Sequence, residues 1–369
     1  MALIDKNSLF TFCIVFLSFL STSGEEPSLK YVRGEKLTLS GQAGTVSTSH
    51  FQRIDSLNRT GLTDAVKTLS SHSAGLNILF QTNSRTIGVK WKVKKFNIKP
   101  NMTPTAINGL DLYGWNAHSW QFVAFAGPDS SANTALMVQN LDGNMRHYRV
   151  YLPLYSELTE IEIGVEEQSV IQPADPEYFP SDKVVIYGSS ITQGASASRP
   201  GMAYPSIISR NLNVETFNLG FSGSGKMEIE VVDVLAKIPA DLYVLDCVPN
   251  TSPELIKERA LPFIKKLRML KPGVPILIVE SIFRESGHWN REIGDRVRRQ
   301  NESIKKVYEQ LRAENYPQLY YIASDELTGT DHEVTIDGTH LNDLGMMRIA
   351  QRIGHEILKI LQLPDNIKH

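Results

Sequence analysis

Four short segments of the sequence carry the groups that a hydrolytic nucleophile needs. Ser190 lies in "YGSSITQG", a glycine-bounded turn that would expose a hydroxyl, and His340 follows Asp337 by three residues in "DGTH". The imidazole can accept the serine proton while the carboxylate orients it and stabilises the imidazolium. Gly223 in "GFSGSG" can offer a backbone N–H and Asn250 in "CVPNTS" a side-chain N–H. Such donors stabilise the oxyanion that forms when an ester is attacked.

The second half of the chain has a repeating pattern of strand-like and helix-like segments, and these elements would position the four groups. Apolar runs such as "KVVIYG", "VETFNLG" and "ADLYVLDCV" alternate with longer segments whose charge content suits surface helices. This alternation predicts a parallel sheet wrapped by helices, with ligands at the carboxyl ends of the strands. In the last predicted helix we expect a core stripe formed by Leu344, Met347, Ile353, Ile357 and Leu361.

The segment "GFSGSGK" (residues 220–226) also fits the start of a phosphate-binding loop, and Asp246 ends an apolar run that could supply a magnesium ligand. A phosphate-binding loop requires a hydroxyl directly after its lysine, and position 227 is Met. We therefore interpret the glycines as a turn that lets the Gly223 amide face a reacting group. We expect no nucleotide and no other cofactor.

The blocks "GSSITQG", "GFSG", "PN" and "DGTH" resemble, in their order and spacing, the four blocks of the SGNH hydrolases, the GDSL-type esterase superfamily. Upstream, "NGLDLYGW" (residues 108–115) resembles the GxDLY motif of bacterial members that carry an additional N-terminal domain. The resemblance implies an α/β fold: a flavodoxin-like, three-layer α/β/α hydrolase domain with a parallel sheet, preceded by a jelly-roll-like β-sandwich.

The same resemblance implies roles for individual residues. Ser190 would be the nucleophile, His340 the general base and Asp337 its orienting carboxylate. The oxyanion hole would be formed by the N–H of Ser190, the N–H of Gly223 and the side chain of Asn250. The usual G-D-S is replaced here by Gly-Ser-Ser, so two adjacent serines are candidates, and Ser190 is favoured because Ile, Thr and a later Gly follow it.

Residues outside these blocks are weaker candidates. Trp115 follows the GxDLY motif, while Arg199 and Trp289 lie in loops expected at the sheet edge, so all three are candidates for binding substrate. A metal site is not expected, because the sequence has no H-E-x-x-H spacing and no cysteine cluster. The pair His332 and His340 is interpreted as a loop residue beside the general base.

The domain organisation follows from changes in pattern along the chain. Residues 1–23 contain Lys6, the apolar run "LFTFCIVFLSFL" and then small residues, which predicts a signal peptide. Residues 24–178 alternate apolar and polar residues in short runs, which predicts the β-sandwich. The proline-rich stretch "QPADPEYFPSD" predicts the boundary to the hydrolase domain over residues 179–369. We expect an exported protein, periplasmic or secreted, without stable membrane insertion once the signal is cleaved.

Composition limits the possible partners. The net charge of −2 over 369 residues provides no basic field for nucleic acid. We predict a serine esterase that removes small acyl groups, most plausibly acetyl, from a small-molecule or glycan substrate through an acyl-enzyme. The alternatives are an esterase, thioesterase or lysophospholipase acting on lipid or aryl esters, and a catalytically inert carbohydrate-binding protein.

Overall fold

The N-terminal half of the protein is built from two antiparallel sheets. This computed structural model describes residues 28–44, 50–178 and 180–364, so the predicted signal peptide lies outside the described residues. The first sheet has the order β1 (Leu29–Arg33), β9 (Leu158–Glu166), β4 (Ile87–Val93) and β7 (Ala132–Val138). The second has the order β10 (Ile171–Pro173), β3 (Asn77–Thr82), β8 (Arg146–Tyr151), β5 (Leu110–Asn116) and β6 (Ser119–Ala126), with β2 (Thr38–Ser40) also paired to β3.

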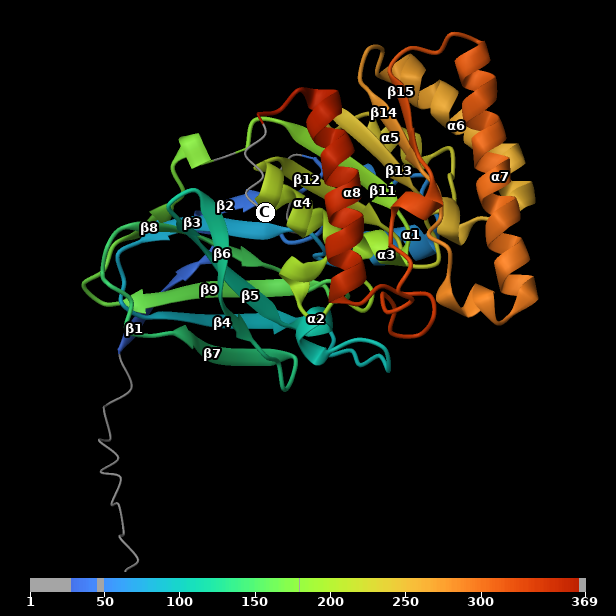
Figure 1. The fold of residues 1–369 in the computed structure, drawn as a ribbon. Coiled ribbons are helices and arrows are strands. Elements are labelled where there is room, and N and C mark those ends of the chain that lie inside the picture. The colour runs from blue at the N-terminus through green and yellow to red at the C-terminus, as the bar shows by residue number, and fades with distance from the viewer. Residues whose placement is uncertain (1–27, 45–49, 179, 365–369) are drawn as a thin grey trace, which may run out of the picture.

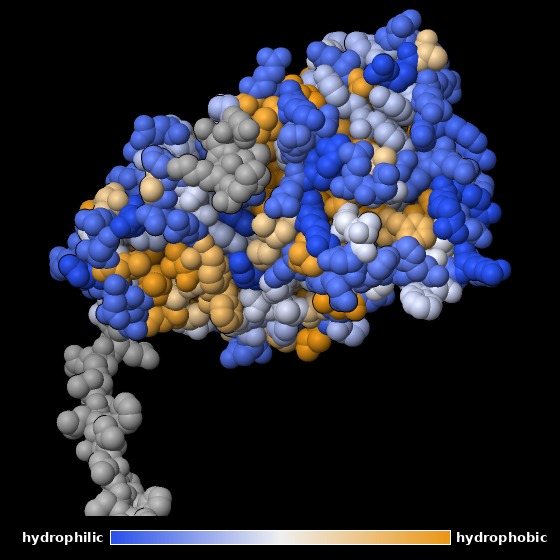
Figure 2. Space-filling model, in the orientation of Figure 1, coloured by the Kyte–Doolittle hydropathy of each residue, from blue (hydrophilic) through white to orange (hydrophobic). Residues whose placement is uncertain are grey.

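The two sheets enclose an apolar core. In β4, Val89, Trp91 and Val93 alternate with exposed lysines, so one face of the strand is buried. These side chains join Ile78, Phe80 and other residues of the second sheet in one cluster. The predicted β-sandwich is therefore confirmed. Its edge strands β6 and β7 expose Phe122, Phe125 and Leu136, and the space-filling view shows apolar surface over the β-rich half (Figure 2).

The C-terminal half contains a parallel sheet. Its order is β12 (Glu215–Gly220), β11 (Lys183–Gly188), β13 (Leu242–Asp246), β14 (Ile276–Val279) and β15 (Leu319–Ile322). The strand order 2-1-3-4-5, counted within this sheet, is that of flavodoxin-like folds. The chain places β12 on one side of β11 and β13 on the other, so the order of the strands reverses at β11. The loops after β11, β12 and β13 therefore meet at the carboxyl edge of the sheet, where the predicted site residues lie.

Helices cover both faces of this sheet (Figure 1). Within the described residues the α-helices are α1 (Asp64–Ser70), α2 (Pro104–Asn108), α3 (Ser190–Gln193), α4 (Tyr204–Leu212), α5 (Val231–Leu235), α6 (Pro253–Leu270), α7 (Arg291–Ala313) and α8 (Asp343–Leu361). Along β11, Val184 and Ile186 pack with α4 and α8, whereas Val185 and Tyr187 pack with α5, α6 and α7. This alternation is the period of two expected for a strand buried on both faces.

The N-terminal half also contributes to the core of the parallel sheet. Ile54, Leu62 and Val66, around α1, belong to the same apolar cluster as the α5–α7 face. Ile107 of α2 and Tyr155 belong to the cluster on the α4 and α8 face. Apolar contacts therefore run continuously between the two halves. Among the described residues, no helix is long and apolar enough to span a bilayer.

Candidate active site

The turn between β11 and α3 holds two serines in different environments. Ser189 is the N-cap of α3, and its Oγ accepts a hydrogen bond from the Ile191 N–H at 3.2 Å. Ser190 is the first residue of the helix, so its N–H has no acceptor within that helix. The short helix ends at Gly194, whose φ of 104° is a left-handed conformation that glycine adopts without strain.

Ser190, His340 and Asp337 form a continuous hydrogen-bonded chain. His340 Nε2 lies 3.0 Å from Ser190 Oγ, and His340 Nδ1 lies 2.8 Å from Asp337 Oδ2. The second carboxylate oxygen, Asp337 Oδ1, accepts from the backbone N–H groups of Thr339 and His340 at 3.0 and 2.8 Å. The Asp337 carboxylate thus binds both the ring and the backbone of the histidine, which fixes the imidazole toward the serine. This is the geometry of a nucleophile, a base and an orienting acid.

Asn101 joins this chain from the N-terminal half of the protein. Its Nδ2 lies 2.9 Å from Asp337 Oδ2 and 3.4 Å from His340 Nδ1. Burial by itself would raise the pKa of Asp337, but hydrogen bonds from His340 and Asn101 outweigh burial and lower that pKa to about 2. No catalytic motif in the sequence pointed to Asn101, which lies in a loop just before α2.

The loop after β12 offers one backbone donor toward the same edge. The N–H groups of Phe221, Ser224 and Gly225 bond to backbone carbonyls, and that of Ser222 donates to Gln193 Oε1 at 3.0 Å. Within the described residues, the Gly223 N–H donates to no protein acceptor, and the residue is exposed with a φ of 70°. Gly223 therefore has a free amide in a conformation that favours glycine.

Asn250 is held beside this loop. Its Nδ2 donates to the Phe221 carbonyl at 3.1 Å, which fixes the amide plane and uses one of its two hydrogens. The side chain comes from the 3₁₀ turn Val248–Asn250, after β13. The structure therefore brings together segments from the ends of β11, β12 and β13 with the 337–340 loop at one edge of the parallel sheet.

Comparison with known proteins agrees with this geometry. Residues 181–358 match the model of the GDSL-like lipase/acylhydrolase family, and residues 29–171 match that of the N-terminus of SGNH-hydrolase-type esterases. A solved structure assigned to a GDSL-like lipase from Bacteroides ovatus is 42% identical, with a TM-score of 0.88, over 91% of this chain and 99% of that one. The chain belongs to the SGNH hydrolases.

More distant solved structures share the fold of this SGNH hydrolase. A salicylyl-acyltransferase from a tetracycline biosynthetic pathway is 17% identical, with a TM-score of 0.73, over 91% of this chain and 99% of that one. A family two carbohydrate esterase from Clostridium thermocellum, in complex with cellohexaose, is 13% identical, with a TM-score of 0.58, over 78% of this chain and 93% of that one. The search of curated proteins gave no match.

The segment 220–226 of this SGNH hydrolase does not have the arrangement of a phosphate-binding loop. Met227 donates its N–H to the Tyr187 hydroxyl at 3.0 Å, and it is buried. Asp246 is buried as well, and it accepts hydrogen bonds from the hydroxyls of Thr192 and Tyr204 at 2.8 Å each. Neither position presents the hydroxyl or the open carboxylate that a magnesium ion would need.

Arg199 lies in the contact between the two halves. Its Nη1 donates to Asp111 Oδ2 at 2.6 Å and also to the Tyr113 hydroxyl, and its guanidinium lies 4.1 Å from the Phe122 ring centroid. Asp111 accepts in addition from the Gly201 N–H at 3.0 Å. The Asp and Tyr of the GxDLY motif therefore bind the loop that follows α3. These contacts give Arg199 a role at the interface, and its contact with substrate stays a prediction.

The two candidate tryptophans have different surroundings. Trp115 is half-buried and packs edge-on against Trp120 and Tyr178, with ring centroids 5.4 and 5.8 Å apart. Trp289 is 93% exposed and directly follows the 3₁₀ turn Glu285–His288. That turn contacts the loop that carries Asp337 and His340, since Ser286 donates its N–H to the Gly338 carbonyl at 3.1 Å. Trp289 is thus an exposed ring on a segment that borders the site.

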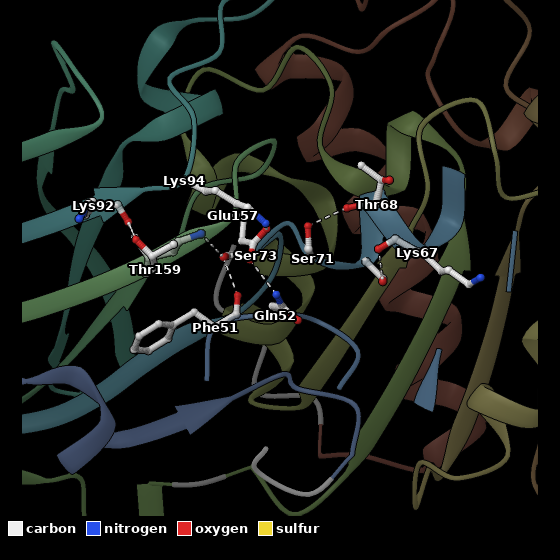
Figure 3. A network of polar contacts seen from close by, with 12 residues as sticks. Phe51, Gln52, Lys67, Thr68, Ser71, Ser73, Lys92, Lys94, Glu157 and Thr159 are labelled. Atoms are coloured by element: carbon white, nitrogen blue, oxygen red, sulfur yellow. Dashed lines mark hydrogen bonds and ion pairs between the residues drawn. The ribbon is translucent and has the colours of Figure 1, made fainter. Parts of the chain in front are cut away.

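A cavity of about 700 Å³ lies between α1 and the segment 94–97. Its lining residues are mostly polar or cationic: Gln52, Arg59, Lys67, Thr68, Ser71, His72, Lys94, Lys95, Asn97 and Glu157. Figure 3 shows Glu157 between Lys94 and Gln52, which donate to it at 3.0 and 2.8 Å.

The cavity connects to the loop after β12 through two hydrogen bonds. Gln193 Nε2 lies 3.2 Å from His72 Nδ1, and Gln193 Oε1 accepts from the Ser222 N–H at 3.0 Å. Burial, assisted by the charge of Arg53, lowers the pKa of His72 to about 4, so at neutral pH its ring is uncharged and its Nδ1 can accept from Gln193. The cavity wall is therefore bonded to the loop that carries Gly223.

Proposed function

We propose that this SGNH hydrolase is a serine esterase that removes small acyl groups, acetyl above all, from carbohydrates. The single observation that carries the proposal is the hydrogen-bonded chain from Ser190 Oγ through His340 to Asp337, with distances of 3.0 and 2.8 Å. A serine hydroxyl, an imidazole and a carboxylate in this order form the acyl-transfer machinery of serine hydrolases.

The proposed reaction has two steps. Ser190 Oγ attacks the ester carbonyl and its proton passes to His340 Nε2, giving a tetrahedral oxyanion. The N–H groups of Ser190 and Gly223 and the Asn250 amide would bind this oxyanion. Collapse breaks the bond to the sugar oxygen, which takes the proton from His340. Water, deprotonated by His340, then attacks the acyl-enzyme, releases the acid and restores Ser190.

The proposal of a carbohydrate substrate is supported by two observations and by one prediction from the sequence. Structures with the same fold include a carbohydrate esterase from Clostridium thermocellum bound to cellohexaose and an acetyl xylan esterase from Butyrivibrio proteoclasticus. Trp289 carries an exposed ring directly after the turn that contacts the 337–340 loop, and aromatic rings offer an apolar face and a polar edge to ligands. The predicted signal peptide supports export, and we propose a periplasmic or secreted enzyme with a two-domain division near residue 178.

Replacing the nucleophile tests the mechanism. Ser190→Ala should abolish hydrolysis of p-nitrophenyl acetate while circular dichroism and the thermal midpoint stay unchanged, because only one hydroxyl, hydrogen-bonded to His340, is lost. Ser189→Ala is the matched control: it removes a helix cap, at a cost of about 1 kcal/mol in stability, and should keep turnover. Retained activity in Ser190→Ala would refute the assignment.

Replacing Trp289 tests the substrate class. Trp289→Ala should raise KM for an acetylated glycan severalfold and leave p-nitrophenyl acetate hydrolysis unchanged, since the small reporter has no sugar ring to stack. Acetate release from a panel of acetylated glycans would identify the polysaccharide. Faster hydrolysis of long-chain acyl esters than of acetyl esters would instead favour the lipid esterase alternative. A serine-directed covalent probe that fails to label the protein would favour an inert carbohydrate-binding protein.

A further inference from the structure

Three side chains outside the proposed catalytic machinery have the composition of a metal site. Glu285 and His288 come from the turn Glu285–His288, and His332 comes from the loop between β15 and α8. Glu285 Oε2 lies 2.8 Å from His332 Nδ1 and 3.8 Å from His288 Nε2, and the three ligand atoms all lie within 4.8 Å of one another. His332 lies far from the other two residues in the sequence, so local motif spacing did not point to the three together and no metal site was predicted.

The ligand chemistry of this cluster matches Zn²⁺. Two imidazole nitrogens and one carboxylate form a common zinc ligand set, with bonds of about 2.1 Å and a water in the fourth position. A tetrahedral centre with such bonds separates its ligand atoms by about 3.4 Å. Two of the observed separations, 2.8 and 3.8 Å, bracket that value, and the two imidazole nitrogens lie within 4.8 Å of each other, so rotation of the exposed imidazoles would complete the set.

The exposure of the three side chains suits an ion that enters from solvent. The Glu285 side chain is 16% exposed, whereas those of His288 and His332 are 46% and 60% exposed. The carboxylate is thus held at the base, and the imidazoles lie on the open side. The ring of His288 also packs edge-on against Phe283, with centroids 4.7 Å apart, which limits its rotation.

We propose that Glu285, His288 and His332 bind one divalent metal ion of zinc-like chemistry. The site does not use the proposed esterase machinery, because among the described residues no hydrogen bond or ion pair joins any of the three to Ser190, His340 or Asp337. Its position nevertheless matters for the reaction. Ser286, next to Glu285, donates both its N–H and its Oγ–H to the Gly338 carbonyl, at 3.1 and 3.2 Å.

A bound ion would therefore cross-link the turn Glu285–His288 to the chain segment that carries the proposed acid and base. His332 precedes Asp337 by five residues, and both lie in the loop that leads into α8. Ligands that bind only the folded state stabilise it by mass action, so the metal should raise the thermal midpoint.

Isothermal titration of untagged, metal-free protein with ZnCl₂ tests the proposal, together with thermal unfolding with and without Zn²⁺. The expected result is saturable binding of one ion per chain and a raised thermal midpoint. His288→Ala, His332→Ala and Glu285→Gln should each weaken binding more than about tenfold. All three should retain wild-type p-nitrophenyl acetate hydrolysis without metal, which also shows that they fold.

Two controls make the outcome decisive. His118→Ala removes an exposed histidine from another part of the protein and should leave zinc binding unchanged. His340→Ala removes the proposed base and should also leave zinc binding unchanged. Binding that survives in His332→Ala, or that is lost only in His340→Ala, would overturn the proposal and assign any zinc effect to the catalytic imidazole.

Discussion

Ser189 and Ser190 show how one position along the backbone decides the role of a side chain. The Ser189 hydroxyl is fully buried and is used to cap α3, whereas the Ser190 hydroxyl lies 3.0 Å from His340 Nε2. A Ser at N-cap satisfies an amide that the helix itself leaves free. We infer that Ser189 replaces the aspartate usual at this position as a helix cap, so that the departure from G-D-S leaves the geometry of the nucleophile intact.

Asn101 yields a prediction at the same scale. Asn101→Ala removes a donor to the Asp337 carboxylate, so the base should be less firmly oriented. We expect kcat for p-nitrophenyl acetate to fall about tenfold, equivalent to about 1.4 kcal/mol of transition-state stabilisation, with KM unchanged. Steady-state kinetics measure this split.

Asn101→Asp distinguishes positioning from simple packing. It preserves the size of the side chain but places a second carboxylate beside Asp337, and like charges disfavour ionisation. The loss of kcat should therefore exceed that of Asn101→Ala. Equal activity in both variants, or a change confined to thermal stability, would remove Asn101 from the positioning of the base. Asn144→Ala, in an exposed loop, is the matched control.

The last residue of β13, Asp246, holds the turn from β11 into α3 in place. Asp246 accepts hydrogen bonds from Thr192 of α3 and Tyr204 of α4, both at 2.8 Å. Gly188 at the end of β11 has no space for a side chain, since an added Cβ would lie 1.9 Å from Thr192 Oγ1. These contacts hold α3 close to the sheet, and they fix the place of Ser190.

The titration of Asp246 gives a prediction about pH. Burial raises the pKa of Asp246 to about 7, although the two hydroxyl bonds oppose the rise. Because the folded-state pKa exceeds the unfolded value of about 3.9, its contribution to stability is full below about pH 4 and is lost as the pH rises toward 7. Asp246→Asn should therefore gain stability relative to wild type between pH 5 and 8, as measured by urea unfolding. If the stabilities of wild type and Asp246→Asn changed equally with pH, the prediction would be wrong. Asp129→Asn, at an exposed position, is the control.

The last helix shows which part of an element a sequence pattern can predict. The predicted stripe correctly included Ile353 and Ile357, which are buried, but Leu344 is 42% exposed. The buried face instead includes Met346 and Ile349. The apolar spacing correctly predicted that this segment is a helix. The rotation of α8 about its own axis depends on how it packs against α4, and the spacing did not determine which residues near its start face the core.

For the whole molecule, Arg53 shows how closely the two halves are joined. The side chain is fully buried, and its guanidinium donates to the carbonyls of Asn218 and Gly220 at 3.0 and 2.6 Å and to those of Leu69 and His72 at 2.6 and 3.1 Å. Burial lowers the pKa of Arg53 to about 9, which leaves the side chain charged at neutral pH. It thus fixes the end of β12 immediately before the loop that carries Gly223.

Loss of Arg53 should weaken both the fold and the site. Arg53→Ala leaves several buried carbonyls without a donor, each costing about 1 to 3 kcal/mol, so the free energy of unfolding should fall by at least about 3 kcal/mol. Turnover should also fall, because the loop after β12 loses its support. Chemical denaturation and kinetics measure the two effects. Arg298→Ala, which breaks an exposed pair with Asp295, should change stability by less than about 0.5 kcal/mol; an equal effect of both would count against the role of Arg53.

Residue types and their spacing were enough to predict the family, the α/β sheet preceded by a β-sandwich, and the segments that carry Ser190, Gly223, Asn250 and His340. These features are encoded locally, in residue type and spacing, because turn chemistry and the periods of strands and helices depend on near neighbours.

Only the tertiary structure decided which distant side chains meet. It brought Asn101 to Asp337, Arg199 to Asp111 and His332 to Glu285, pairs that are separated by between 47 and 236 residues. Such contacts depend on how apolar faces pack across the two halves, and no short stretch of sequence records that packing.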